Sequence, residues 1–548
     1  MAESLHGTGV SSGIAIGPLV QMGAPIRELP TPVVRGDPAT ELTRALRALG
    51  EVADDLERRR DRAEGDAIAV LDALSMMARD PALMDAVERE TLEGRPAPHA
   101  VDAAIGGFRA ALEAAGGYLA ERSADLQDLR NRAVARLLHL PMPGVPDHAE
   151  PFILSADDLA PADTVDLRPG HVLAIVTAAG GITSHTAIIA KAMGLPCIVG
   201  CSEIGEVADG TIAIVDGSTG LVTVAPDAGA IAVAERRRDD RLALLARSVG
   251  PGRTQDGHAV QLLLNLGAGE DVSDADAEGV GLLRTEFLFL DRTTEPTVDE
   301  QVAAYAEVFA GFTDRKVVVR TLDVGADKPL PFVEPGPGEN PALGLRGWRL
   351  RAQNPGLVER QLTAIAKAAI TAPCEVWVMA PMIATVAEAE TFVQTAHDVG
   401  LATAGVMVEV PSIALQAERL VEVVDFASIG TNDLSQYTFA ADRLVGELGE
   451  LLDPWQPAVV ELIARTARAG TAAHTPIGVC GEAASDPLLA LVLVGAGCTS
   501  LSMAPSAIAE VRASLAATTL ATCRELTEIA LAAADGNGAR HAVATAIA

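Results

Sequence analysis

The sequence is poor in aromatic residues, in positive charge and in long apolar runs. Trp, Tyr and Phe make up 3% of the 548 residues, while hydrophobic residues reach 49%, so aliphatic side chains must build the cores. That hydrophobic share is too high for a disordered chain. The 42 basic residues are outnumbered by 74 acidic ones, giving a net charge of −32, which disfavours nucleic acid as a partner and favours a basic protein surface. No stretch approaches the roughly 18–20 unbroken apolar residues that span a bilayer.

Cysteine is also scarce. The six cysteines are scattered along the chain, which is typical of a reducing compartment and not of a disulfide scaffold. Cys197 and Cys201 lie close in sequence, but no second pair and no nearby histidine follows at the spacing of a zinc site. The first residues have neither the basic nor the apolar segment of a signal peptide. We therefore expect a cytoplasmic protein without membrane insertion, with roughly three to four domains.

Changes in composition and periodicity divide the chain. Residues 1–25 predict one or two strands, and residues 37–140 repeat apolar positions every three or four residues, which predicts several helices. Strand-like runs return between Phe152 and Pro226. We expect the first segment and this one to form a single α/β domain interrupted by the helices. Residues 228–248 predict one charged helix, a natural linker between domains.

After Pro251, eight β-rich runs mostly alternate with helical stretches, as in a (β/α)₈ barrel. The runs lie at 260–266, 279–289, 316–324, 375–383, 404–410, 426–430, 476–481 and 498–504. In such a barrel the loops after the strands build the active site. The polar residues that end or follow these runs are Asn265, Arg284, Arg320, Glu409, Asn432, Asp433 and Cys480. A barrel does not need these groups for packing, so we expect a site at that end.

The segment GGITSHTAIIAKAMG, residues 180–194, joins a glycine turn to a predicted helix. Thr183 or Ser184 can cap that helix, which places His185 in its first turn. There, free N–H groups and the positive end of the helix dipole stabilise an anion on or near the ring. A lone histidine is more often an ordinary surface residue, and it is the setting of His185 that favours a functional one.

This segment resembles the phosphohistidine signature of the phosphoenolpyruvate-utilising enzymes, which include Enzyme I of the bacterial phosphotransferase system, pyruvate phosphate dikinase and phosphoenolpyruvate synthase. Further runs are similar to the phosphoenolpyruvate and Mg²⁺ site of Enzyme I and follow in the family's order. They are LLRTEFLFLDR, VVRTLDVGADK, NPALGLRGWRLR, GVMVEVPSIAL, SIGTNDLSQYTFAADR and GVCGEAASD.

The resemblance implies an α/β multidomain protein. It implies a swivelling phosphohistidine domain at residues 1–27 and 146–227, interrupted at 28–145 by a helical subdomain that binds the phosphocarrier protein HPr. A linker helix at 228–252 then leads to a phosphoenolpyruvate-binding (β/α)₈ barrel at 253–548, through which the family forms homodimers.

The resemblance also implies which side chains bind the substrate. It places on the phosphate the arginines Arg284, Arg320, Arg346 and Arg443, with Arg349 a weaker candidate. Any one of these arginines also fits a surface ion pair, and only their joint match favours the phosphate role. The residue before Arg346 is Leu345 where the family commonly has an aromatic residue, so the packing there is expected to differ.

Metal binding and proton transfer are implied for the remaining strand ends. Glu409 and Asp433 supply the hard oxygen atoms that Mg²⁺ prefers, and Asn432 is implied to bind the substrate. Cys480 is implied to be the acid–base group that exchanges a proton with C3 as the enolate becomes pyruvate. Without the resemblance, a buried thiol is more simply a small apolar residue.

The helical segment at residues 28–145 resembles the family more in its position along the chain than in its amino-acid sequence. Met76, Met77, Leu83 and Met84 are candidates for an apolar docking patch for HPr, because methionines suit adaptable binding surfaces. Packing inside the helical core is the alternative for these four residues.

The implied enzyme is a phosphoenolpyruvate-protein phosphotransferase. It transfers the phosphoryl group of phosphoenolpyruvate to His185 and then to a histidine of HPr, releasing pyruvate as the first step of sugar uptake. A dikinase or synthase is an alternative, but it needs a nucleotide domain for which we expect no room. A metal-dependent aldolase would use Glu409 and Asp433 without His185. A non-catalytic binding module should have lost one of these groups.

Overall fold

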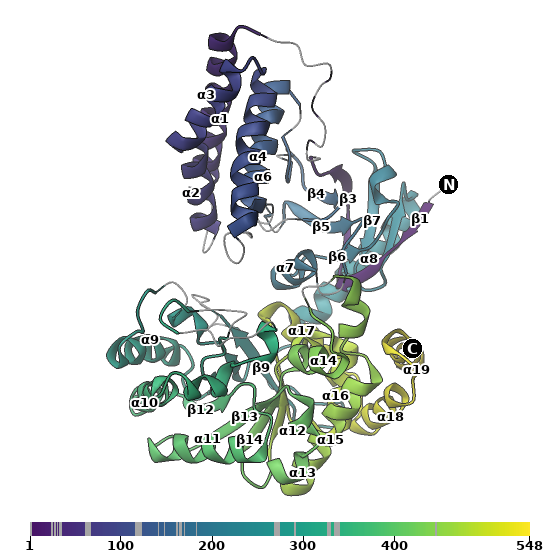
Figure 1. Ribbon diagram of the computed structural model, residues 1–548. Helices are drawn as coiled ribbons and strands as arrows, with labels where there is room; N and C mark the ends of the chain where they lie inside the picture. The colour runs from purple at the N-terminus through teal and green to yellow at the C-terminus, as the bar shows by residue number, and fades with distance from the viewer. Residues whose placement is uncertain are drawn as a thin grey trace. The chain divides into compact units, whose positions relative to one another are not determined.

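The computed structural model describes residues 3–547 apart from 24–25, 27–28, 30, 32–35, 61–66, 116–122, 141, 147, 160–162, 164–166, 169, 182–183, 268–274, 290–291, 326–329, 334–339 and 444–445. The chain divides into two compact units, Met1–Arg238 and Asp239–Ala548 (Figure 1). Each unit has its own sheet and its own hydrophobic core.

Within the described residues, the first unit contains an eight-stranded mixed sheet. Its strands are β1 (Glu3–His6), β2 (Thr8–Ser11), β3 (Ile14–Gln21), β4 (Phe152–Ala156), β5 (Val172–Thr177), β6 (Cys197–Val199), β7 (Ile212–Asp216) and β8 (Leu221–Val224). They lie in the order β1-β8-β7-β3-β4-β5-β6-β2. Strand β3 pairs parallel with β4 and antiparallel with β7. Segments from both sides of the helical block therefore share one sheet, which confirms that expectation. Strand β4 was not predicted individually.

Close backbone approach fixes the turn between β7 and β8. A Cβ atom on Gly217 would lie 2.0 Å from the carbonyl oxygen of Ser11, so no larger residue fits without moving the backbone. The glycine thus lets β2 and the β7–β8 turn come together.

The inserted helices form a bundle with a core of its own (Figure 1). They are α1 (Pro38–Arg60), α2 (Ala67–Ala78), α3 (Pro81–Leu92), α4 (Ala97–Ala115) and α6 (Ser123–Leu138). Helix α1 buries Leu49, Val52 and Leu56 at the helical spacing of three and four residues. The predicted helical periodicity is therefore confirmed.

Helix α8 (Ala228–Arg247) crosses the boundary between the two units. Ala234 is the one buried residue along it, and charged residues occupy much of its middle. This element corresponds to the predicted linker helix. Among the helices that the structure describes, none combines the length and apolarity needed to cross a membrane.

The second unit is a closed barrel of parallel strands. Its strands are β9 (Gln261–Leu266), β10 (Gly279–Leu283), β11 (Lys316–Arg320), β12 (Glu375–Ala380), β13 (Ala404–Val408), β14 (Phe426–Ile429), β15 (Ile477–Val479) and β16 (Ser500–Met503). Each strand pairs with the next, and β16 closes the barrel on β9. The predicted (β/α)₈ barrel is confirmed strand by strand, although the run predicted at 279–289 stops being a strand at Leu283.

Helices surround these strands (Figure 1). They include α9 (Val298–Ala310), α10 (Leu357–Ala369), α11 (Val386–Asp398), α12 (Pro411–Ala414), α13 (Ala417–Leu420), α14 (Thr431–Phe439), α15 (Pro457–Ala473), α16 (Pro487–Ala496), α17 (Pro505–Ala516), α18 (Leu520–Leu531) and α19 (Gly536–Ile547). Short 3₁₀ segments are η2 (Ile204–Glu206) in the first unit and, in this one, η3 (Glu286–Leu288), η4 (Pro341–Leu343), η5 (Gly347–Ala352), η6 (Gly446–Leu452) and η7 (Glu482–Ser485). The main core lies between strands and helices. A second, smaller cluster fills the barrel interior.

Candidate active site

The carboxyl ends of the barrel strands bring most of the predicted site residues to one end of the barrel. Arg320 is the last residue of β11, and Arg284, Glu409 and Cys480 directly follow β10, β13 and β15. Asn432 and Asp433 lie in the first turn of α14, after β14. Because all eight strands are parallel, these ends face the same side of the barrel.

A buried carboxylate, Asp323, links two of the predicted arginines. Arg346 donates from Nε to Oδ1 at 2.9 Å and from Nη2 to Oδ2 at 3.0 Å, and Arg320 places Nη1 2.9 Å from Oδ2. Arg320 also donates to Glu286 at 2.7 Å. Burial alone would lower the pKa of Arg320, but the carboxylates of Asp323 and Glu286 outweigh it and raise the pKa. Both guanidinium groups are thus fixed as cations in defined orientations.

Sequence reasoning missed Asp323 and Glu286. They lie in the two motifs quoted for Arg320 and Arg284, three and two residues after those arginines. The signal that could have found them is physical: a buried guanidinium requires a counter-charge, and the nearest acids in the same motif are the first candidates.

Arg346 contacts a second carboxylate on its other side. Its Nη1 and Nη2 atoms donate to Oδ1 and Oδ2 of Asp433 at 3.1 and 3.2 Å. Burial would lower the pKa of Arg346, and the charges of Asp323 and Asp433 more than reverse that effect. Arg346 and Asp433 are therefore in direct contact, as a shared site requires. Leu345 packs against a small apolar cluster that contains Leu322, Leu350 and Phe289, which shows how leucine is accommodated there.

The other predicted arginines are in different environments. Arg284 is exposed, Arg443 is half-buried, and neither side chain forms an ion pair within the part of the chain that the structure describes. Arg349 lies 3.7 Å from Glu388 at the start of α11. Among the residues that the structure describes, Arg284 and Arg443 thus have no partner carboxylate, whereas Arg320 and Arg346 are each paired with buried carboxylates.

Glu409 is a buried carboxylate among other carboxylates. Its Oε1 accepts the main-chain N–H of Met382 at 2.6 Å. Burial, followed by the negative charges of Asp323 and Asp433, raises the pKa of Glu409 to about 8, while Arg320 opposes the rise. Gly430 makes room for it, because a Cβ atom there would lie 3.0 Å from Oε2. Binding of either a proton or a cation would therefore stabilise this carboxyl group.

Cys480 is a buried thiol held by its neighbours. Its Sγ lies 3.6 Å from the carbonyl oxygen of Ile429, and its own carbonyl accepts from Asn265 Nδ2 at 3.0 Å. Burial raises the pKa of Cys480 to about 11, and a hydrogen bond with Ser428 partly opposes the rise. The side chain is therefore a protonated thiol at neutral pH.

Asn432 faces the loop after β15. Its Nδ2 donates to Glu482 Oε1 at 3.3 Å, and its Oδ1 accepts the main-chain N–H of Glu482 at 3.2 Å. Gly481 permits this approach, since a Cβ atom there would lie 2.0 Å from the Thr431 hydroxyl. The loops after β14 and β15 are therefore joined at the site by a residue, Glu482, that sequence reasoning did not single out.

The phosphohistidine-like motif lies in the first unit. Helix α7 (His185–Met193) starts at His185, with Ser184 as its N-cap and Gly194 in a left-handed conformation as its C-cap. Ser184 Oγ accepts the N–H of Ala187 at 3.3 Å. The Thr186 hydroxyl donates to Asp158 at 2.9 Å, which fixes the first turn to the loop after β4. The His185 side chain and Thr183 lie outside the described residues.

The candidate docking residues separate into two groups. Met76 is 75% exposed, and Leu83 is buried in the bundle core. Met77 and Met84 are half-buried. Leu83 thus follows the core-packing alternative, while Met76 has the exposure that a docking patch requires.

Comparisons with known proteins cover both units. Three family models match the chain: the N-terminal domain of PEP-utilising enzymes at residues 6–122, their mobile domain at 148–220 and their PEP-binding domain at 246–520. The phosphoenolpyruvate-protein phosphotransferase of Streptomyces coelicolor is 50% identical over 548 residues, which covers 99% of each chain. The chain belongs to the phosphoenolpyruvate-protein phosphotransferase family.

A second curated relative agrees with that membership. The phosphoenolpyruvate-protein phosphotransferase of Geobacillus stearothermophilus is 35% identical, covering 94% of this chain and 93% of its own. Among solved structures, the solution structure of an Enzyme I protein is 30% identical over 43% of this chain and 99% of its own, with a TM-score of 0.39. Family membership makes this chain an enzyme of the phosphotransferase class, as predicted.

Proposed function

We propose that this protein transfers the phosphoryl group of phosphoenolpyruvate to His185 and then to a histidine of the phosphocarrier HPr, releasing pyruvate. This is the first step of sugar uptake by the phosphotransferase system. The observation that carries the proposal is the group of arginines, carboxylates and a protonated thiol at one end of the barrel. Phosphoenolpyruvate has a phosphate, a carboxylate and a carbon that must gain a proton, and these groups match all three.

Substrate binding divides between the two kinds of arginine. Arg284 and Arg443 have no carboxylate partner among the described residues, so they supply the net positive charge that attracts a trianionic substrate. Asp323 holds both Arg320 and Arg346 in place. Arg320 therefore has N–H groups that are oriented before substrate arrives, whereas Arg346 already donates to Asp323, Asp433 and Tyr437. Asn432 adds a neutral hydrogen-bonding side chain. This arrangement favours positioning and charge stabilisation, the main requirements of phosphoryl transfer.

The residues present fit a bound Mg²⁺. Glu409 and Asp433 would hold it, because both are hard oxygen donors and the crowding of negative charge that raises the pKa of Glu409 would be relieved by a cation. No cluster of three or more acidic, histidine or cysteine ligands was found among the described residues, so water and substrate oxygens would complete the coordination. When bound, Mg²⁺ would supply positive charge next to the phosphoryl group.

The later steps follow from Cys480 and His185. A thiol with a pKa of about 11 keeps its proton until the enolate of pyruvate forms beside it, and it then protonates C3. His185, at the start of α7, attacks phosphorus as a neutral imidazole, and the helix N-terminus stabilises the phosphorylated ring.

Two different transfers by one histidine require movement, so we propose that residues 1–27 and 146–227 swivel about the 228–252 linker. The helices at 28–145 would bind HPr, with the exposed Met76 in the docking patch. Residues 253–548 would form the homodimer, and the protein would act in the cytoplasm.

The test is incubation of the purified protein with ³²P-labelled phosphoenolpyruvate and Mg²⁺, without nucleotide. Label that is acid-labile, base-stable, absent from His185→Ala and transferable to added HPr supports the proposal. Labelling that requires ATP would indicate a dikinase-like enzyme instead.

A further inference from the structure

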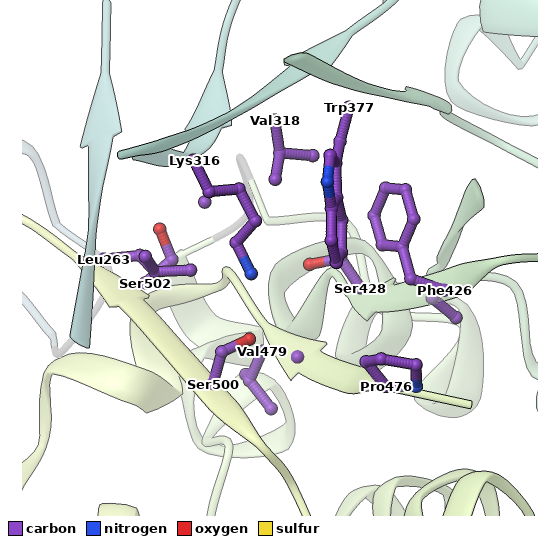
Figure 2. A pocket seen from close by; sticks show the side chains of 13 residues that line it. Leu263, Lys316, Val318, Trp377, Phe426, Ser428, Pro476, Val479, Ser500 and Ser502 are labelled. Carbon is purple, nitrogen blue, oxygen red and sulfur yellow. The ribbon is translucent and has the colours of Figure 1, made fainter. Parts of the chain in front are cut away.

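A small cavity lies inside the barrel near the strand starts, opposite the candidate active site. Its lining includes Lys316, Trp377, Phe426, Ser428, Ser500 and Ser502 (Figure 2). Lys316, Phe426 and Ser500 are the first residues of β11, β14 and β16. The cavity has a volume of about 20 Å³ and is partly open to solvent. It can hold a water molecule, which needs about 10–15 Å³.

Lys316 brings an ionisable group to this cavity. Its Nζ donates to Gln261 Oε1 at 2.7 Å and lies 4.3 Å from the centre of the Trp377 ring. Burial lowers the pKa of Lys316 to about 8, and the carboxylates of Glu375 and Glu278 oppose the fall. This amine therefore gives and takes a proton readily near neutral pH, and nothing in the proposed reaction yet uses it.

Ser428 connects the cavity to Cys480. Its side chain lines the cavity (Figure 2). Ser428 directly precedes Ile429, whose carbonyl oxygen lies 3.6 Å from Cys480 Sγ, and a hydrogen bond with Ser428 lowers the pKa of the Cys480 thiol. Gly478 keeps the space beside it open, because a Cβ atom there would lie 2.5 Å from Ser500 Oγ and 3.8 Å from Ser428 Oγ. Ser428, Ser500 and Lys316 therefore place two hydroxyls and an amine around a space for water.

We infer that the proton exchanged by Cys480 passes through Ser428 and cavity water to Lys316, and so to solvent at the amino-terminal end of the barrel. This rests on the proposed function, in which the thiol protonates C3. The C3–H bond forms as the S–H bond breaks, leaving a thiolate. The thiolate takes the hydroxyl proton of Ser428, Ser428 takes one from water, and water takes one from the Lys316 ammonium. Bulk water then reprotonates the amine.

Energetics and access both favour this route. An ammonium group with a pKa near 8 reprotonates a thiolate whose conjugate acid has a pKa near 11 in a downhill step. At the carboxyl ends of the strands, where the candidate active site lies, the positive charges of Arg284 and Arg320 act on Cys480 and oppose the approach of a proton. Glu409 acts in the opposite sense. Substrate at the strand ends would also exclude water from that side.

The inference is tested by following tritium released from [3-³H]pyruvate into water in the presence of Mg²⁺. In the wild type, tritium taken from C3 by Cys480 washes out through the relay. In Ser428→Ala and Lys316→Met, it should return to the same carbon, so release should fall at least tenfold. Ser428→Thr, which keeps the hydroxyl, should restore release, and Lys367→Met on the exposed surface of α10 is the control for loss of a lysine.

Phosphorylation by labelled phosphoenolpyruvate is measured on the same samples. The expected result is slow tritium release with phosphoryl transfer reduced less than twofold. Wild-type release in both Ser428→Ala and Lys316→Met would overturn the inference, because the proton would then leave through the substrate side. Equal loss of release and phosphorylation would indicate general damage to the site and would also overturn it. A wild type that is not phosphorylated would instead refute the proposed function.

Discussion

Replacing Glu409 by glutamine should remove a large pH dependence from the stability of the barrel. The pKa of Glu409 is about 8 in the folded protein, against 4.5 for an ordinary glutamate, because of burial and the charges of Asp323 and Asp433. The folded state therefore holds this proton more tightly than the unfolded chain does. The contribution of Glu409 to the free energy of unfolding is therefore complete below about pH 4.5 and is lost as the pH rises towards 8.

The size of the effect follows from the two pKa values. Between pH 5 and pH 8, linkage predicts a loss of about 3–4 kcal/mol of unfolding free energy from this one group. Glu409→Gln cannot ionise, so its stability should lack this component. The difference between variant and wild type should therefore move by about 3 kcal/mol in favour of the variant over this pH range.

Tryptophan fluorescence during urea unfolding can measure this in the barrel alone. The chain contains 3 tryptophans, Trp348, Trp377 and Trp455, and all lie in the second unit. The curves are recorded with a chelator present and then with added Mg²⁺, which should restore stability at pH 8 in the wild type more than in Glu409→Gln. Parallel pH profiles for the two proteins between pH 5 and 8 would refute the reasoning.

Three further results are expected. Asp323→Asn should destabilise the barrel by about 3–5 kcal/mol in the same fluorescence assay, because two buried arginines lose a shared counter-charge; exposed Asp398→Asn should cost less than about 0.5 kcal/mol. Arg284→Met should weaken phosphoenolpyruvate binding about 10–100-fold by calorimetric titration without changing the unfolding curve. Gly217→Ala should cost at least about 2 kcal/mol in the calorimetric transition of the first unit, whereas Gly205→Ala, with open space at its Cβ position, should have little effect.

The barrel could be predicted because parallel strands that are mostly buried are short apolar runs, and each of the eight runs contains such a strand. The residues at which the strands end were harder to predict, since the apolar residues after Leu283 form a 3₁₀ turn and not a continuation of the strand. Strand β4 escaped individual prediction because five buried residues, FILSA, carry no periodicity.

Within the site, residues next to strand ends were predictable from position, whereas their counter-ions were not. Asp323 and Glu286 are two acids among 74, and their place in the arginine motifs becomes a signal only once Arg320 is known to be buried and to need a counter-charge. Lys316 posed a similar difficulty: in KVVVR nothing marks the first residue as facing the barrel interior, because a strand buried on both faces does not alternate.

The pairing of buried charges bears on how the site distinguishes its substrate. Arg320 and Arg346 are neutralised by Asp323, Glu286 and Asp433, so a phosphate that approaches them must compete with carboxylates already in place. In the proposed function, a trianion would offset that competition by also engaging Arg284 and Arg443, and a monoanion would do so less strongly. A cation held by Asp433 would also weaken the hold of that carboxylate on Arg346 and free its N–H groups. We therefore propose that metal and substrate bind with positive cooperativity, each lowering the cost of the other.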